Sequence, residues 1–179
     1  PLARSCSGKA LLKLAEAASS DFTRADLIEF LNLADVVRSE PGEAPKSEWN
    51  RLSMVAGIVS GGEAWKNGLE RLSVWFGEAA PDSRFAEEHG SLSASLPELR
   101  DTLMAVLDHL GDLPGRDLPA RFLDRLVGAF LAVTRDGAER DRVVRAASDV
   151  RALSSIAGPV TFRRFTDMLR TALGSPSDR

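Results

Sequence analysis

The stretch SEWNRLSMVAGIVSGGEAWKNGLERL, from Ser47 to Leu72, decides the fold class because two helical patterns flank a glycine-rich turn. Ser47 predicts the N-cap of the first helix, and Gly57 predicts the left-handed residue that ends it. After the turn IVSGG, the second helix carries its apolar side chains on one face at spacings of three and four: Trp65, Leu69, Leu72 and Phe76. Glycine has no side chain to hold backbones apart, so the turn predicts that the two tryptophan-bearing helices cross closely.

The same spacing extends outward over nearly the whole chain, and alternating strand patterns are absent. Further helices are predicted at residues 8–19, 97–110 and 138–157, and three more after the caps Thr23, Asp117 and Thr161. We therefore expect an all-α fold, an irregular bundle of about eight helices with no sheet. The side chains expected to be buried in this bundle are Trp65, Leu69, Phe122, Phe130, Phe162 and Phe165.

The domain organisation follows from length and composition. A chain of 179 residues with 44% hydrophobic content suits one helical domain with a core of its own. A polar linker at residues 81–96 is expected to join two halves, residues 1–80 and 97–174. Pro1 is not a start residue, and the chain stops just after a helical pattern, so we expect residues 1–179 to be a domain excised from a larger polypeptide.

The single cysteine, Cys6, excludes an internal disulfide, which fits a reducing compartment. No apolar run approaches the roughly 18 residues that cross a bilayer, and the N-terminus lacks the order of a signal peptide. We expect a soluble, cytoplasmic protein without a membrane partner.

Motifs for catalysis are incomplete in this sequence. A phosphate-binding loop requires a glycine where Ala3 stands and a hydroxyl residue where Ala10 follows Lys9. Ser60 is displaced from the G-x-S-x-G arrangement of hydrolases. The run Glu87, Glu88, His89 and the acidic set Asp101, Asp108, Asp112 do not form a metal-binding pattern. We therefore expect no catalytic residue, cofactor or metal in this fragment, and the interpretation as an independent enzyme is disfavoured.

Charge is distributed unevenly along the chain. The net charge is −3, but residues 1–113 hold 11 basic and 18 acidic residues, whereas residues 114–179 hold 12 and 8. A phosphate-facing surface is therefore expected only in the C-terminal third. Intrahelical ion pairs are predicted for Arg145 with Asp141 and Asp149, and for Arg163 with Asp167. The arginines left without an expected partner are the candidate DNA-binding residues: Arg135, Arg140 and Arg164. An ordinary solvated surface with uneven charge is the alternative.

Three segments carry a family resemblance. In the quoted stretch the relevant residues are Trp49, Arg51, Leu52, Ile58, Val59, Gly61, Gly62, Trp65, Arg71 and Leu72. The other two segments are DFTRADLIEFL, residues 21–31, and RALSSIAGPVTFRRFTDMLRTAL, residues 151–173. Together they resemble the accessory region of bacterial AddB-type helicase-nuclease subunits, relatives of the UvrD/Rep helicases. Thr23 departs from this pattern, because the family often has proline there.

The resemblance implies a non-catalytic helical accessory domain, similar to domain 2B of UvrD/Rep helicases, in an ATP-dependent helicase-nuclease that acts in DNA double-strand break repair. Its implied partners are the remainder of the parent helicase-nuclease chain, duplex DNA and a partner helicase subunit. The ATP-binding and nuclease residues of the family are absent from this segment. The alternative is a structural or protein-protein interaction helical module without a nucleic-acid role.

Overall fold

Helices make up most of the computed structural model, which describes residues 2–38, 43–78 and 83–174. Eight α-helices have ten or more residues: α1 (Cys6–Ser19), α2 (Arg24–Leu33), α3 (Lys46–Val55), α4 (Gly62–Glu78), α6 (Leu96–Leu110), α7 (Pro119–Val133), α8 (Ala138–Ala147) and α10 (Phe162–Gly174). The shorter elements are α5 (Arg84–His89), α9 (Ser154–Ala157) and the 3₁₀ helices η1 (Leu2–Arg4), η2 (Gly90–Ser95) and η3 (Ser148–Leu153). The described ranges contain two isolated β-bridges and no strand, which confirms the all-α prediction.

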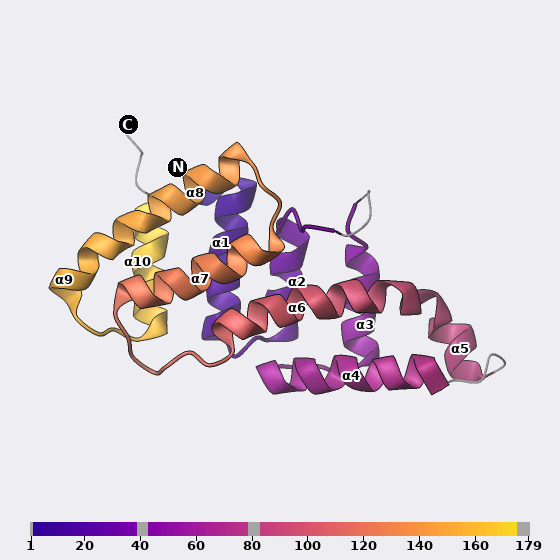
Figure 1. The fold of residues 1–179 in the computed structure, drawn as a ribbon. Coiled ribbons are helices and arrows are strands. Elements are labelled where there is room, and N and C mark those ends of the chain that lie inside the picture. The colour runs from indigo at the N-terminus through magenta and orange to yellow at the C-terminus, as the bar shows by residue number, and fades with distance from the viewer. Residues whose placement is uncertain (1, 39–42, 79–82, 175–179) are drawn as a thin grey trace.

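The helices form an elongated arrangement (Figure 1). Helix α1 packs against α2, α7, α8 and α10, while α6 packs against α7 on one side and α4 on the other. Figure 1 shows α9 and α10 at one end of the molecule and α5, beyond the last turn of α4, at the opposite end. Helices of residues 1–80 thus pack directly on helices of residues 97–174.

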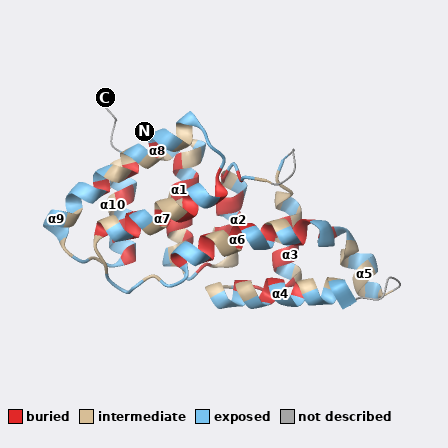
Figure 2. Ribbon diagram, in the orientation of Figure 1, coloured by how far each residue is buried: buried red, intermediate tan, exposed pale blue. Residues whose placement is uncertain are grey.

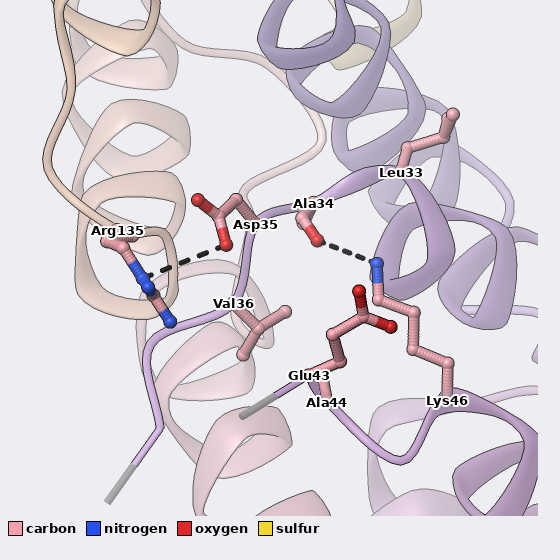
Figure 3. Close-up of a pocket in the computed structure, with 8 residues that line it drawn as sticks. All are labelled: Leu33, Ala34, Asp35, Val36, Glu43, Ala44, Lys46 and Arg135. Atoms are coloured by element: carbon pink, nitrogen blue, oxygen red, sulfur yellow. Dashed lines mark hydrogen bonds and ion pairs between the residues drawn. The ribbon is translucent and has the colours of Figure 1, made fainter. Parts of the chain in front are cut away.

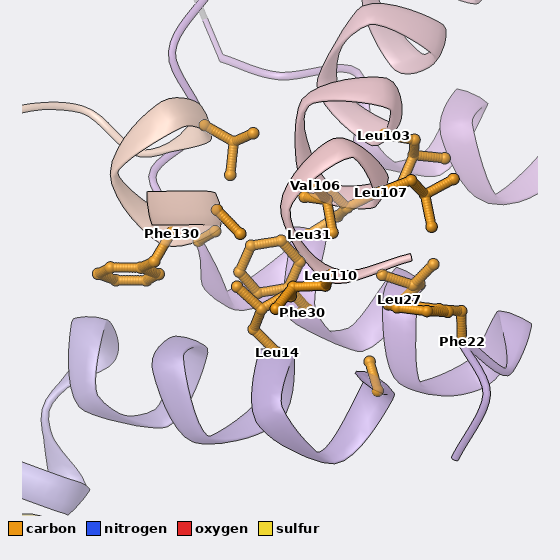
Figure 4. Close-up of a cluster of buried hydrophobic side chains, with 14 of the residues drawn as sticks. Leu14, Phe22, Leu27, Phe30, Leu31, Leu103, Val106, Leu107, Leu110 and Phe130 are labelled. Atoms are coloured by element: carbon orange, nitrogen blue, oxygen red, sulfur yellow. The ribbon is translucent and has the colours of Figure 1, made fainter. Parts of the chain in front are cut away.

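A continuous hydrophobic core joins these helices. Figure 2 shows that buried residues gather on the central helices, whereas α9 is mainly exposed. At the junction of α1, α2, α6 and α7, the labelled side chains of Figure 4 pack together: Leu14, Phe22, Leu27, Phe30, Leu31, Leu103, Val106, Leu107, Leu110 and Phe130. All six side chains predicted to be buried are buried, with exposed fractions between 0% and 8%.

Helix termini follow the sequence signals in part. The Thr23 hydroxyl accepts a hydrogen bond from the Asp26 amide at 3.3 Å, and Gly57 has φ +68°, so both predictions are confirmed. Ser47 is not a cap, because α3 begins at Lys46 and Pro45 holds the N-cap position. Asp117 is not the cap of α7 either. That helix begins at Pro119, a residue that suits a first helical turn, and Leu118 is its N-cap.

Two segments differ from the predicted elements. The expected polar linker, residues 81–96, is helical from Arg84 to the start of α6 in its described part, and Leu92 within it is buried. A six-residue helix and a 3₁₀ helix are too short to show a clear apolar period. The single helix expected at residues 138–157 is instead divided into α8, η3 and α9. This break brings the Ser154 hydroxyl to the Ala120 amide, 2.8 Å away, so that it satisfies a free N–H group in the first turn of α7.

The glycine-rich turn docks on the connection between α1 and α2. Asp21 and Phe22 both have left-handed backbones, with φ of 55° and 53°. Their carbonyls accept hydrogen bonds from the Gly61 amide at 2.6 Å and from the Trp65 indole at 2.8 Å. The close approach of α4 to the end of α3 depends on Gly68, where an added Cβ would lie 2.9 Å from Ile58 Cγ1. The prediction that the turn glycines set this approach was therefore wrong. Gly61 instead provides a positive φ of 96°.

Candidate functional surface

The first candidate arginine, Arg135, lies at a pocket between the connections α2–α3 and α7–α8 (Figure 3). Its amide donates to the Asp35 carbonyl at 2.8 Å, and its guanidinium lies 3.8 Å from the Asp35 carboxylate. Lys46 donates to the carbonyls of Asn32 and Ala34 at the C-terminal end of α2, at 2.8 and 3.0 Å. The pocket has a volume of about 420 Å³ and is lined by Leu33, Ala34, Asp35, Val36, Glu43, Ala44, Lys46 and Arg135. Its cations are thus engaged within the fold, and the expectation that Arg135 lacks a partner was wrong, because Asp35 comes from the distant α2–α3 connection.

Arg140, the second candidate, is engaged by its own neighbourhood. Its side chain is only 14% exposed, and its guanidinium lies 2.6 Å from the Asp136 carboxylate and 3.4 Å from that of Asp141. It also donates to the Thr134 carbonyl at 3.0 Å. The expectation that Arg140 lacks a partner was therefore wrong. The reason is the loop before α8, which places Asp136 one helical turn upstream of the arginine.

Arg164, the third candidate, is exposed and has no interacting partner for its guanidinium among the described residues, as predicted. It lies far from the other two. Arg135 follows the C-terminal end of α7, whereas the bridge between Asp117 and Val160 places the start of α10 beside the N-terminal end of α7. Helix α7 has 15 residues, which corresponds to about 22 Å. The three candidates therefore do not form one surface.

Two arginines that were expected to be paired are free of carboxylates in the described structure. Arg145 on α8 and Arg163 on α10 are exposed, and neither forms an ion pair with another described residue. Asp141 pairs with Arg140 and Asp167 pairs with Arg170. Asp149, the other expected partner of Arg145, lies in η3 beyond the end of α8 and forms no ion pair with a described residue. Spacing along one helix missed these competing partners. Within the described part of the C-terminal third, the exposed arginines without a hydrogen-bond, ion-pair or electrostatic partner are Arg145, Arg163 and Arg164.

Carboxylates in the C-terminal third are mostly engaged. Four carboxylates form ion pairs with arginine guanidinium groups: Asp117, Asp124, Asp136 and Asp167. Glu139 accepts a hydrogen bond from the Ser7 amide at 2.8 Å, in the first turn of α1. That backbone bond is the main reason why the pKa of Glu139 lies below its ordinary value. Most described carboxylates of this region are therefore paired or hydrogen-bonded, whereas Asp149 is exposed and forms no ion pair with a described residue.

A second network joins α1 to α2. Asp26 accepts hydrogen bonds from Ser20 at 2.5 Å, Thr23 at 2.7 Å and Lys13 at 3.1 Å. The Ser20 bond contributes most to the lowered pKa of Asp26, although burial opposes it. Burial likewise lowers the pKa of Lys13, but its bonds to Glu29, Asp26 and Glu16 together raise that pKa well above the ordinary value. These groups hold the turn that contains Asp21 and Phe22, and they are structural.

The residues that carry the family resemblance mainly serve packing. Trp49, Leu52, Ile58, Trp65 and Leu72 are buried. Arg71 donates to the Ala56 carbonyl at 3.0 Å, which joins α4 to the end of α3. The stretch therefore supplies a helix junction.

Metal and nucleophile chemistry finds little support in the described ranges. They contain no group of three or more His, Cys, Asp or Glu side chains that could hold a metal ion. Asp101, Asp108 and Asp112 are all exposed along and after α6. Cys6 is an exposed free thiol. It lines a pocket of about 250 Å³ that has no histidine among its lining residues.

Comparisons with models of protein families, with curated proteins and with solved structures give no match to this chain. Within the part of the chain that the structure describes, no helix has the length and apolar character that crossing a membrane requires.

Proposed function

We propose that this chain is a non-catalytic helical accessory domain of a UvrD/Rep-related helicase-nuclease subunit and that it faces duplex DNA through the C-terminal third. The family resemblance supports the first part of the proposal. The observation that carries the second is the set of exposed arginines in the C-terminal third that have no partner among the described residues: Arg145, Arg163 and Arg164. Phosphate groups are the common ligands of free guanidinium groups, which bind them through paired hydrogen bonds.

Packing does not account for two of these arginines. Arg163 and Arg164 lie in the first turn of α10, where the helix dipole disfavours positive charge. Both are exposed, so they also contribute little buried area. A ligand with negative charge would remove this electrostatic cost. With few free cations on an acidic chain, binding to DNA is expected to be weak near physiological salt and measurable at low salt.

The test is duplex DNA binding at low salt by a triple charge reversal, Arg145→Glu, Arg163→Glu and Arg164→Glu. We expect binding to be lost. The matched control reverses three exposed cations outside the C-terminal third, Lys9, Arg51 and Arg84, and should retain most of the binding. Lys46 is a poor control because it caps α2. If both triple variants lose binding equally, the effect is one of net charge, and the proposed surface is wrong.

A second function, protein docking without nucleic acid, is favoured by one observation at the same end. A groove of about 460 Å³ lies between η3 and α10, and its apolar lining comprises Val150, Leu153, Met168 and Ala172. Ile156 in the adjacent α9 is 84% exposed. Two results would favour this docking function. One is that the triple variant of Arg145, Arg163 and Arg164 still binds DNA, and the other is that the unaltered chain does not bind DNA at low salt.

A further inference from the structure

The opposite end of the molecule carries an aromatic pocket that the proposed DNA role does not use. Trp75 in α4 and Phe85 in α5 form an edge-to-face pair, with ring centroids 5.9 Å apart and an angle of 78° between the planes. Phe76 and His89 also contact Phe85, each at 5.2 Å between ring centroids. A pocket of about 290 Å³ lies at this pair, lined by Trp75, Glu78, Ser83 and Phe85.

Trp75 differs from the other two tryptophans of the chain. Trp49 and Trp65 are fully buried, whereas Trp75 is 44% exposed, beside the exposed Val74. The guanidinium carbon of Arg71 lies 6.0 Å from the centroid of the Trp75 ring. This distance is at the outer limit of a cation–π contact, so the ring already has a cation near it. An exposed indole of this kind is typical of a binding surface.

The charge around the pocket is negative. The Glu78 carboxylate lines the pocket, is exposed and has no cation partner in the described ranges. Glu70, two turns earlier in α4, and Glu87 in α5 are likewise exposed without such a partner. Arg84 pairs with Glu88 at 2.7 Å, so that cation is not available to balance them. Carboxylates repel phosphates, which disfavours stacking of a nucleic-acid base on Trp75.

We infer that this pocket binds a lysine or arginine side chain from a basic segment of a partner protein. The methylene stem of such a side chain would lie against the Trp75 and Phe85 rings, as long cationic side chains do on apolar surfaces. Its charged head would reach the Glu78 carboxylate at the rim. The pocket is small for a drug-sized ligand but suits one long side chain. The inference does not depend on the proposed DNA role.

The tryptophan environments provide the measurement. Because Trp49 and Trp65 are fully buried, a change in fluorescence on adding a surface ligand reports mainly on Trp75. The probe is a short amidated peptide of alternating arginine and leucine. We expect a saturable change in emission that is absent with a matched glutamate-leucine peptide, and absent from the Trp75→Phe variant.

A pair of charge variants locates the site. Glu78→Lys is expected to weaken peptide binding about tenfold, because it removes the rim carboxylate and adds a like charge. Asp108→Lys changes the net charge equally. Asp108 lies in α6 next to Leu107, which contacts Gly62 at the start of α4. Because Glu78 is at the other end of α4, the two sites are about 25 Å apart. The Asp108→Lys variant should bind like the unaltered chain. Glu78→Gln, which keeps the shape of the side chain, should give an intermediate loss with an unchanged circular dichroism spectrum.

Several outcomes would overturn the inference. Equal weakening by Glu78→Lys and Asp108→Lys would mean that only net charge matters. A Trp75 response to duplex DNA that matches the peptide response would assign the pocket to nucleic acid. Concentration-dependent self-association that is lost in Glu78→Lys, without peptide binding, would assign it to a second copy of this chain.

Discussion

The two ends of this molecule are both built from helices and turns, but they expose side chains of opposite charge. At the α8–α10 end, carboxylates are largely engaged within the fold and arginines are left exposed, as Arg145 and Arg164 show. At the α4–α5 end, the exposed groups are carboxylates and aromatic rings, as Glu78 and Trp75 show. The comparison indicates that the net charge of −3 describes neither surface. What each end can bind depends on which of its cations and carboxylates are already paired within the fold.

The largest expected effect is a loss of stability on removing a buried aromatic side chain at one end, compared with an exposed one at the other. Phe165 is fully buried and contacts Phe122 and Phe162, with ring centroids at 5.7 and 5.3 Å. Phe165→Ala should lower the free energy of unfolding by about 3–5 kcal/mol, because it leaves a cavity between α7 and α10. Trp75→Ala should cost clearly less, since nearly half of that side chain is already exposed. Urea unfolding of both variants gives the comparison. Equal losses would show that the aromatic end is core as well.

A second prediction concerns Asp26, in the network that joins α1 to α2. Its folded pKa lies below the ordinary value of about 3.9, so the stabilisation it provides is complete above that value and is lost as pH falls through the folded pKa. Asp26→Asn should lower the free energy of unfolding at neutral pH by about 1–3 kcal/mol, because Lys13 and two hydroxyls lose a charged partner. The variant should also flatten the decline of stability between neutral and acidic pH. Unfolding curves across this range, with Asp101→Asn as an exposed control, provide the check.

The smallest expected effect tests whether the exposed arginines of α10 serve binding and not stability. Arg163→Glu with Arg164→Glu should stabilise the fold slightly, by about 0.3–1 kcal/mol, because negative charge suits the first turn of α10. The same variant should bind duplex DNA more weakly and with a shallower salt dependence. Thermal unfolding and DNA titration on one preparation separate the two effects. A marked loss of stability would mean that these arginines serve the fold.

The fold could be predicted from the sequence because each longer helix has an apolar spacing that can be recognised within its own segment. Apolar spacing identified the eight longer helices, and small polar or glycine residues such as Thr23 and Gly57 located several of their ends. The short elements α5 and η2 were missed because they contain too few residues to show a period. Spacing also failed at residues 138–157, where the contact of Ser154 with the first turn of α7 accompanies a break that no local pattern indicates.

The candidate surface could be predicted less well, because a carboxylate can pair with any of several nearby arginines and spacing does not decide which pair forms. Arg140 was expected to be free, but it is held by Asp136 and the Thr134 carbonyl. Arg145 was expected to pair within α8, but Asp141 pairs with Arg140 instead. The choice of the C-terminal third rested on a count of charges and remains a prediction. The aromatic pocket at Trp75 had no sequence signal beyond the residue type, since it requires two helices to meet.

The packing of α1 against α10 also matters for how the chain is made. Arg170 donates to Glu16 across 154 positions of sequence, and the Ser7 amide is satisfied by Glu139 across 132 positions. Ribosomes add roughly 5–20 residues per second, so these partners of α1 emerge roughly 7–30 s after it. Of the longer helices that α1 contacts in the folded domain, α2 follows directly, whereas α7, α8 and α10 begin only at residue 119 or later. The nascent chain therefore exposes an apolar helix face for seconds, and it is a natural substrate for chaperones that shield such faces during translation.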